Sequence, residues 1–177
     1  METPRLRLRP WREEDLEPYA RICADPEAMR YLLGGNGGPL TREQSAGQIA
    51  SFTRRWEEWG FGPWAVEHRA TGGLIGRIGL NYYEDFPEGK YKTEVGWLLD
   101  PAYWSRGLAT EGAAAAYRYG FREVGLERII GIVKPENLAS RRIMEKSGLC
   151  LQGEVRFRGH DMVWYAIDYE DWEYMEV

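Results

Sequence analysis

A short segment around Arg106 and Gly107 combines residues that can hold an anion. Residues 104–112, WSRGLATEG, lie between a strand-like run and an alanine-rich run. A helix that begins here presents unpaired backbone N–H groups and the positive end of its dipole. Gly107 and the small Ala109 let a phosphate approach the backbone closely, and Arg106 adds a cation. We expect a phosphate site at this junction, with a plain tight turn as the alternative.

Other nucleotide and metal motifs are missing from the sequence. It has no G-x-x-x-x-G-K-[ST] loop and no G-x-G-x-x-G after its first strand, so ATP and NAD binding lack their usual motifs. Cys23 and Cys150 are far apart without metal-ligand spacing, and His68 and His160 complete the histidines and cysteines. We therefore expect reduced thiols, as in a cytoplasmic protein, and no structural zinc site.

The composition is that of a folded domain with a sizeable core. Of 177 residues, 44% are hydrophobic and 14% aromatic, which argues against disorder. The 23 basic and 28 acidic residues give a net charge of −5, which does not favour a nucleic-acid partner. No apolar run approaches the roughly 20 residues that span a bilayer, and the first residues are strand-like rather than a signal peptide. We expect one domain over residues 1–177, in the cytoplasm, without a membrane partner.

The elements that must position the site follow from hydrophobic spacing. Alternating or continuous apolar residues predict strands, and i, i+3, i+4 spacing predicts helices. The capping box of Thr41 and Gln44 marks one helix start. Strands are expected at 5–11, 63–69, 72–83, 91–99, 128–133, 151–158 and 161–169, and helices at 16–23, from 41 onward, at 107–124 and at 137–148. Residues 32–40 should form a loop and the acidic segment 168–177 a solvated end, so the chain reads as one α/β domain.

Two motifs on these elements resemble the acetyl-CoA-binding core of the GNAT acyltransferase superfamily. In the first, Gly107 and Ala109 match the family loop [QR]-x-x-G-x-[GA], and Trp104 stands where Gln or Arg is commonest. The second, NLAS followed by EKSGL, lies within residues 137–149. The strongest match covers residues 91–149. The sequence is most similar to the branch that acetylates ribosomal-protein N-termini, the RimJ- and RimL-like proteins.

The resemblance implies a fold, a cosubstrate and a set of binding residues. The fold would be a mixed, mostly antiparallel sheet of six to seven strands flanked by about four helices. Acetyl-CoA would donate an acetyl group to a primary amine, on a small molecule or a protein N-terminus, by direct attack in a ternary complex without a metal. A homodimer is left open. The implied contacts to acetyl-CoA are Leu98, Leu99, Arg106, Gly107, Leu108, Ala109, Thr110 and Asn137. Asn137 would hold the pantetheine arm, or serve as a helix N-cap, or both.

Two side chains are candidates for proton transfer. The acceptor amine must lose a proton to attack a thioester, so a base is needed. Relatives often carry a glutamate at the place of Glu94, where it is proposed as that base; the alternative is a surface carboxylate paired with Lys92, Arg77 or Arg128. Ser140 would donate a proton to the departing sulfur, and its alternative is a hydrogen bond to its own helix backbone.

Two other classes of function compete with the enzyme. One is a catalytically idle acyl-CoA-binding or sensor domain, and the other is a structural interaction module. Retention of both Glu94 and Ser140 favours the enzyme, because an inert domain needs neither. The aromatic residues Trp56, Trp59, Trp64, Tyr82 and Tyr83 are expected mostly in the core, with one or two at the wall of the acceptor site.

Overall fold

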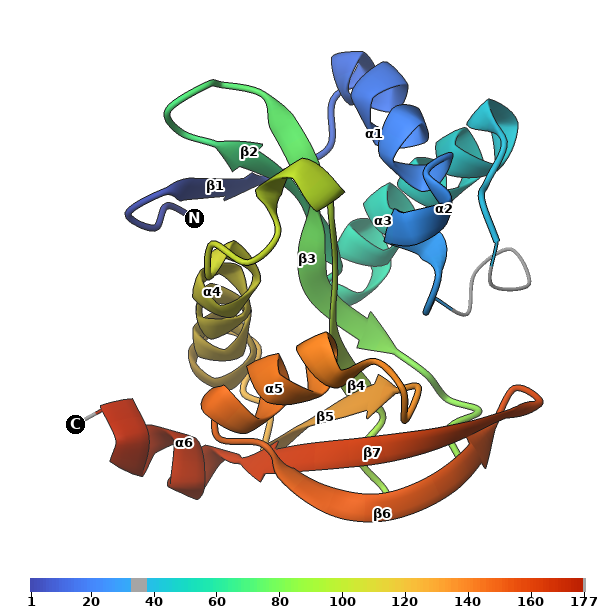
Figure 1. Ribbon diagram of the computed structural model, residues 1–177. Coiled ribbons are helices and arrows are strands. Elements are labelled where there is room, and N and C mark those ends of the chain that lie inside the picture. Colours follow the sequence, from blue (N-terminus) through green and yellow to red (C-terminus); the bar gives the residue numbers. More distant parts are fainter. Residues whose placement is uncertain (33–37, 177) are drawn as a thin grey trace.

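Seven strands form a mixed sheet with the order β1-β2-β3-β4-β5-β7-β6 (Figure 1). The computed structural model describes residues 1–32 and 38–176, so most of the loop predicted at 32–40 lies outside the described residues. The strands are β1 (Leu6–Arg9), β2 (Pro63–His68), β3 (Leu74–Tyr82), β4 (Thr93–Leu99), β5 (Arg128–Val133), β6 (Cys150–Phe157) and β7 (His160–Asp168). Among the described strand pairs, β4 and β5 run parallel and the others antiparallel, which confirms the expected architecture.

Helices pack on both faces of this sheet. The helices are α1 (Leu16–Cys23), α2 (Pro26–Met29), α3 (Arg42–Trp59), α4 (Leu108–Arg122), α5 (Leu138–Lys146) and α6 (Tyr169–Glu176). Tyr19 of α1 and Phe52 of α3 bury with Leu98 on one face of β4. Tyr117 of α4 buries with Val95 on the opposite face. The alternation of side chains along β4 therefore separates the α1–α3 face from the α4 face.

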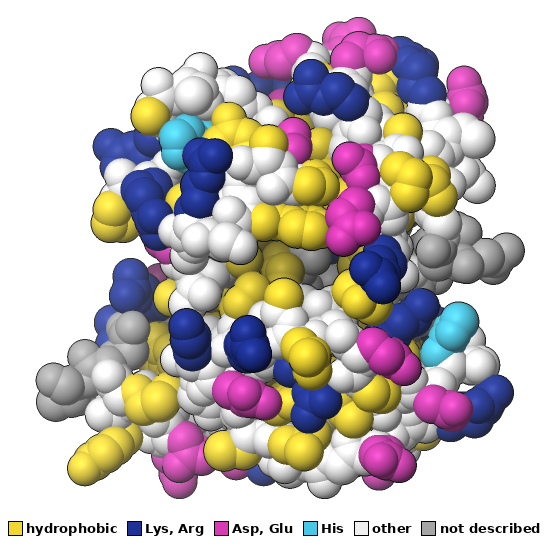
Figure 2. Space-filling view, in the orientation of Figure 1, with side chains coloured by type: hydrophobic (Ala, Val, Ile, Leu, Met, Phe, Trp, Pro, Cys, Tyr) yellow, Lys and Arg dark blue, Asp and Glu magenta, His cyan; other side chains and the backbone are white. Residues whose placement is uncertain are grey.

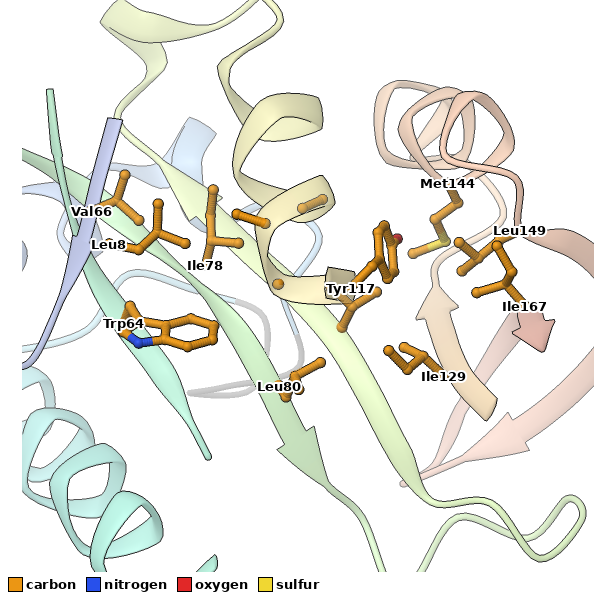
Figure 3. Packing of buried hydrophobic residues seen from close by; sticks show 14 of the residues in the cluster. Leu8, Trp64, Val66, Ile78, Leu80, Tyr117, Ile129, Met144, Leu149 and Ile167 are labelled. Carbon is orange, nitrogen blue, oxygen red and sulfur yellow. The ribbon is translucent and has the colours of Figure 1, made fainter. Parts of the chain in front are cut away.

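Small residues let α4 approach the sheet closely. A Cβ at Gly112 would lie 2.3 Å from Cδ1 of Ile78, so any larger residue at this crossing of α4 and β3 would require the Ile78 side chain to move. The neighbouring Ala113 and Ala116 are fully buried in the same cluster. Figure 3 shows Tyr117 and Ile78 of this cluster. This packing sets the axis of α4, and with it the position of the N-terminus of α4 beside the end of β4.

The sequence predicted the start of α3 correctly but missed two helices. The Thr41 hydroxyl accepts from Gln44 N at 3.2 Å, and Thr41 N donates to the Gln44 side chain at 2.8 Å, which completes the predicted capping box. The short α2 was not predicted; Asp25 caps it, and Pro26 occupies its first turn. The segment 168–177 was expected as a solvated end, and most of its described side chains are exposed, but residues Tyr169–Glu176 also form the helix α6. Its Trp172 is 3% exposed, because its ring packs 5.1 Å from that of Phe121.

Candidate active site

The sheet opens between β4 and β5. These strands pair in parallel at Glu94 and Ile130, whereas β4 pairs with β3 along its whole length. Asp100 N donates to the carbonyl of Ile75 on β3 at 2.8 Å. Because hydrogen-bonded pairs alternate along an antiparallel ladder, the main-chain groups of Leu98 face β3. Those of Trp97 and Leu99 face the opening.

Leu98 and Leu99 were both predicted to contact pantetheine, but this alternation points their main-chain groups in opposite directions. Leu99 presents its main chain at the open edge of β4, and Leu98 directs its N–H and carbonyl to β3. The Trp104 indole Nε1 donates to the Leu99 carbonyl at 2.8 Å. Trp104, the departure from the family loop, thus ties that loop to the end of β4. The main-chain groups that still face the opening on this edge are the N–H and carbonyl of Trp97 and the N–H of Leu99.

Glu94 is a buried carboxyl group with one side-chain hydrogen bond. It is 8% exposed, and its Oε2 accepts from Asn81 Nδ2 at 3.0 Å. Burial raises the pKa of Glu94 to about 7, against the lowering effects of the Asn81 hydrogen bond and of nearby arginine charges. The alternative of a solvated surface carboxylate is therefore wrong. Such a group is half ionised near neutral pH and can accept a proton there.

The room around the Glu94 carboxyl group comes from a glycine. On β4, Gly96 follows Glu94 on the same face of the strand, and a Cβ at Gly96 would lie 3.1 Å from Oε2 of Glu94. Asn81, directly opposite Glu94 on β3, is held in turn by Arg55 of α3, whose Nη1 donates to Asn81 Oδ1 at 2.7 Å. A chain of hydrogen bonds thus orients the Glu94 carboxyl group.

Ser140 and Asn137 lie at the start of α5, next to β4. Asn137 Oδ1 accepts from Ser140 N at 3.1 Å, so the N-cap role of Asn137 is confirmed. The Ser140 hydroxyl accepts from Trp97 Nε1 at 3.3 Å. Within the described chain, Ser140 Oγ makes no hydrogen bond to its own helix backbone, which leaves its proton available. The proposed acid role of Ser140 stays a prediction.

The predicted phosphate loop forms the N-terminus of α4. Gly107 is the N-cap residue with φ +73°, and no described side chain caps the first turn. The backbone N–H groups at 108–110 are those that lack intrahelical partners. Arg5 of the N-terminal segment braces this turn, because its Nη1 donates to Arg106 O at 2.7 Å and its Nε to Glu111 Oε2 at 2.6 Å. Arg106 itself is exposed, with its guanidinium 5.3 Å from the Tyr103 ring centre.

A cavity of about 230 Å³ joins both faces of the sheet at the opening between β4 and β5. Its lining includes Phe52, Arg55, Arg77, Asn81, Tyr83, Glu94, Trp97, Asn137, Ser140 and Arg158. A hollow with hydrophobic side chains crosses the face of the molecule shown in Figure 2. The cavity thus brings Glu94, Asn137 and Ser140 together. The phosphate loop at 106–110 is not part of its lining.

Sequence reasoning missed several residues of this cavity. Asn81, Arg55 and Arg158 were not predicted, and Arg77 was considered only as an ion-pair partner of Glu94. The missing information is the register that sets Asn81 opposite Glu94. Of the aromatic residues expected near the acceptor, Tyr83 lines the cavity. Lys92 and Arg128 bond elsewhere, to the Phe86 carbonyl and to Asp168, respectively.

The structure adds two observations on metals and membranes. Among residues 1–32 and 38–176, no group of three or more His, Cys, Asp or Glu side chains is placed to hold a metal ion. Within the same residues, no helix combines the length and hydropathy needed to cross a bilayer.

Comparison with known proteins defines the class to which this geometry belongs. Residues 5–149 match the acetyltransferase (GNAT) domain family. The chain is 32% identical over 176 residues to the uncharacterized N-acetyltransferase YnaD of Bacillus subtilis. The matched region covers 96% of this chain and 97% of YnaD. A GNAT-family acetyltransferase from Bacillus anthracis superposes with a TM-score of 0.80 at 29% identity, over 96% and 98% of the two chains. Mycobacterium smegmatis RimJ in complex with CoA-disulfide gives a TM-score of 0.76 at 20% identity, over 94% and 83%.

The chain therefore belongs to the GNAT acetyltransferase family and is an acyltransferase. The superposition on Mycobacterium smegmatis RimJ shows that the two chains share this fold.

Proposed function

We propose that this protein transfers an acetyl group from acetyl-CoA to a primary amine by direct attack in a ternary complex. The observation that carries the proposal is the position of Glu94, buried in a cavity at the opening between β4 and β5, with a pKa of about 7. A base with this pKa is suited to take a proton from an amine at neutral pH.

Residues on both sides of the opening fit the two ends of acetyl-CoA. The diphosphate would lie against the backbone N–H groups at 107–110, at the positive end of the α4 dipole, where Gly107 leaves no side chain in the way. Arg106 would add a cation. The pantetheine arm would follow the outward main-chain edge of Trp97 and Leu99, as an added strand does. Asn137 would flank this arm at the start of α5.

Two side chains would move the protons. Bound acetyl-CoA supplies the acetyl group as a thioester, whose carbonyl carbon the acceptor nitrogen attacks while the carbon–sulfur bond breaks. Glu94 accepts a proton from that nitrogen, directly or through a water. The Ser140 hydroxyl donates a proton to the departing sulfur and regains one from solvent. The products are an acetamide and free CoA, so the reaction needs no oxidant or metal.

Thiol release from acetyl-CoA in the presence of an amine panel tests this proposal. We expect release that depends on an added amine, with the acetylated amine detected by mass spectrometry, and a much lower rate for Glu94→Gln. Binding of CoA, seen as a thermal shift, without transfer to any amine would instead support the idle acyl-CoA-binding domain.

A further inference from the structure

Two arginines in the cavity lack a carboxylate partner. Arg55 projects from α3 and Arg77 from β3, and both line the cavity that holds Glu94. Among the residues that the structure describes, neither forms an ion pair with an acidic side chain. Each is partly buried, and burial of an uncompensated charge is costly. These guanidinium groups therefore require an explanation.

Each guanidinium is fixed at one nitrogen and open at the others. Arg55 Nη1 donates to Asn81, and Arg77 Nε donates to the Tyr19 hydroxyl at 3.2 Å. The Tyr19 hydroxyl donates in turn to Gln48 Oε1 at 2.7 Å. Arg77 also lies over the Phe52 ring, 5.4 Å from its centre. The remaining guanidinium nitrogens have no hydrogen-bond partner in the described part of the chain: Nε and Nη2 of Arg55, and both Nη atoms of Arg77.

Two other arginines, one buried in the fold and one at the cavity wall, do have carboxylate partners. Arg9, which is 7% exposed, contacts Asp15 through two nitrogens at 2.7 and 2.8 Å and Glu67 at 3.0 Å. Arg158, also at the cavity wall, makes two hydrogen bonds to Asp85 at 2.8 and 2.9 Å. Arg55 and Arg77 depart from this pattern at the place where an acceptor would bind.

Glu94 offsets only part of this positive charge, because it attracts the arginines without forming an ion pair with either. Its carboxyl group is bonded to Asn81 rather than to either arginine. The charged side chains that line the cavity are Arg55, Arg77, Arg158 and Glu94, so positive charge exceeds negative even when Glu94 is ionised. A polycationic acceptor would add to this excess. An acceptor with an anionic group would relieve it.

We infer that the acceptor is a small amine that carries a carboxylate, held by Arg55 and Arg77 while its amino group faces Glu94. The inference rests on the proposed function and names the substrate class of the same site. A planar guanidinium with two free nitrogens matches the two oxygens of a carboxylate. The cavity of about 230 Å³ also has to admit the thioester end of acetyl-CoA beside Asn137 and Ser140, so the space beside the arginines suits the reacting end of a small acceptor.

Matched acids and amides test the inference in the wild-type protein. The panel contains free amino acids, the corresponding amino acid amides, spermidine and short peptides with acidic first residues. We expect kcat/KM for the acids to exceed that for their amides by about 10- to 100-fold, the range of a hydrogen bond to a charged group. Equal use of amides or spermidine, or acetylation confined to peptides, would overturn the inference.

Arginine variants assign the preference to these side chains. Arg55→Met should lower the ratio of kcat/KM for an acid to kcat/KM for its amide by at least about tenfold. Because Arg55 bonds Asn81, this variant also disturbs the partner of Glu94. That disturbance lowers kcat/KM for the acid and for the amide alike, so it leaves their ratio unchanged. Arg77→Met should act likewise, and Arg54→Met, at the exposed neighbouring position of α3, serves as the matched control. An unchanged ratio in both Arg55→Met and Arg77→Met, with folding verified by melting temperature, would contradict the assignment.

A binding measurement separates this inference from the proposed function. In calorimetry with the CoA-loaded protein, an amino acid should bind at least about tenfold more tightly than its amide, and Arg55→Met should abolish the difference. This readout needs no turnover. If no amine is acetylated but this difference is found, the proposed function fails and the carboxylate site stands. If transfer occurs without the difference, only the carboxylate site fails.

Discussion

Single side chains around the opening between β4 and β5 account for the chemistry that we propose. Burial raises the pKa of Glu94 from 4.5 to about 7, although the hydrogen bond from Asn81 and the nearby arginine charges lower it in part. Gly96 leaves the space beside its carboxyl group. Ser140 keeps its hydroxyl proton free of its own helix and toward the same cavity. The partners of Glu94 and Ser140 come from other elements, β3 and β4 respectively, whereas Gly96 lies on the same strand as Glu94.

Replacement of Ser140 by alanine should slow turnover without unfolding α5. The CoA thiolate is a fair leaving group, because a thiol pKa is about 8.5. The loss in kcat should therefore be about 10- to 100-fold, at the low end for a proton-transfer group. The melting temperature should hardly change, because Asn137 still caps the helix. Steady-state kinetics at saturating substrates measures the loss.

Asn137→Ala provides the contrast for Ser140→Ala. Loss of an N-cap side chain costs about 1 kcal/mol of stability, so this variant should melt earlier. A wild-type kcat in Ser140→Ala, or a rate loss explained by a large drop in melting temperature, would leave Ser140 with a structural role only.

At the scale of elements, the start of α4 and the open edge of β4 are the parts that would hold acetyl-CoA. The close contact of α4 with β3 at Gly112 places the first turns of that helix against the sheet, and the left-handed N-cap Gly107 precedes it. Arg5, from the first residues of the chain, ties the turn before α4 to Glu111 within it. Together with the hydrogen bond from Trp104 to the Leu99 carbonyl, these contacts hold the phosphate loop beside the end of β4.

Gly107→Val should weaken CoA binding by about tenfold or more. At Gly107, φ is +73°, so a β-branched side chain strains the turn and also obstructs the N–H groups of α4. The control is Gly72→Val in the turn between β2 and β3, where φ is +69° and no described atom lies within 4 Å of an added Cβ. Both variants should lose stability, but only Gly107→Val should lose affinity in calorimetry. Equal CoA affinities would contradict the site.

The sequence was most informative about elements and least about contacts between strands. The strand RIIGIV and the capping box of α3 were predicted at their observed places, because both are local patterns. The motif at 104–112 predicted the start of α4 for the same reason. The partnership of Glu94 with Asn81 was not predictable, because the ten residues between β3 and β4 do not reveal the register. The burial of Trp172 depends likewise on a distant ring, that of Phe121.

At the scale of the whole molecule, the proposed active site reduces the free energy of unfolding that the hydrophobic core provides. Buried apolar side chains from β1 to α6 form one large cluster behind α4. Glu94 is placed in the sheet beside this core, where its charged form is disfavoured. The catalytic group that we propose therefore carries a stability cost that depends on pH.

Glu94→Gln should stabilise the folded protein at alkaline pH. The folded-state pKa is raised, so the favourable contribution of Glu94 is fully present below its unfolded pKa of 4.5 and is lost as the pH rises through about 7. At pH 8 the variant should be more stable by on the order of 3 kcal/mol. At pH 5 the gain should fall to about 1 kcal/mol or less.

Urea unfolding of both proteins at the two pH values measures this difference. Glu57→Gln, at an exposed position of α3, should show no such dependence. A gain that is the same at pH 5 and pH 8 would mean that Glu94 titrates at its ordinary pKa.

The dependence of kcat on pH, measured for the wild type and Glu94→Gln with two acceptors whose amine pKa values differ, tests the central claim most directly. Glu94 as the base predicts that wild-type turnover declines below about pH 7 with both acceptors. If protonation of the amine caused the decline, the pH of the decline would instead differ between the two acceptors. In Glu94→Gln, the rate should be much lower and the decline near pH 7 should be absent. An unchanged decline and a wild-type rate in Glu94→Gln would contradict the account.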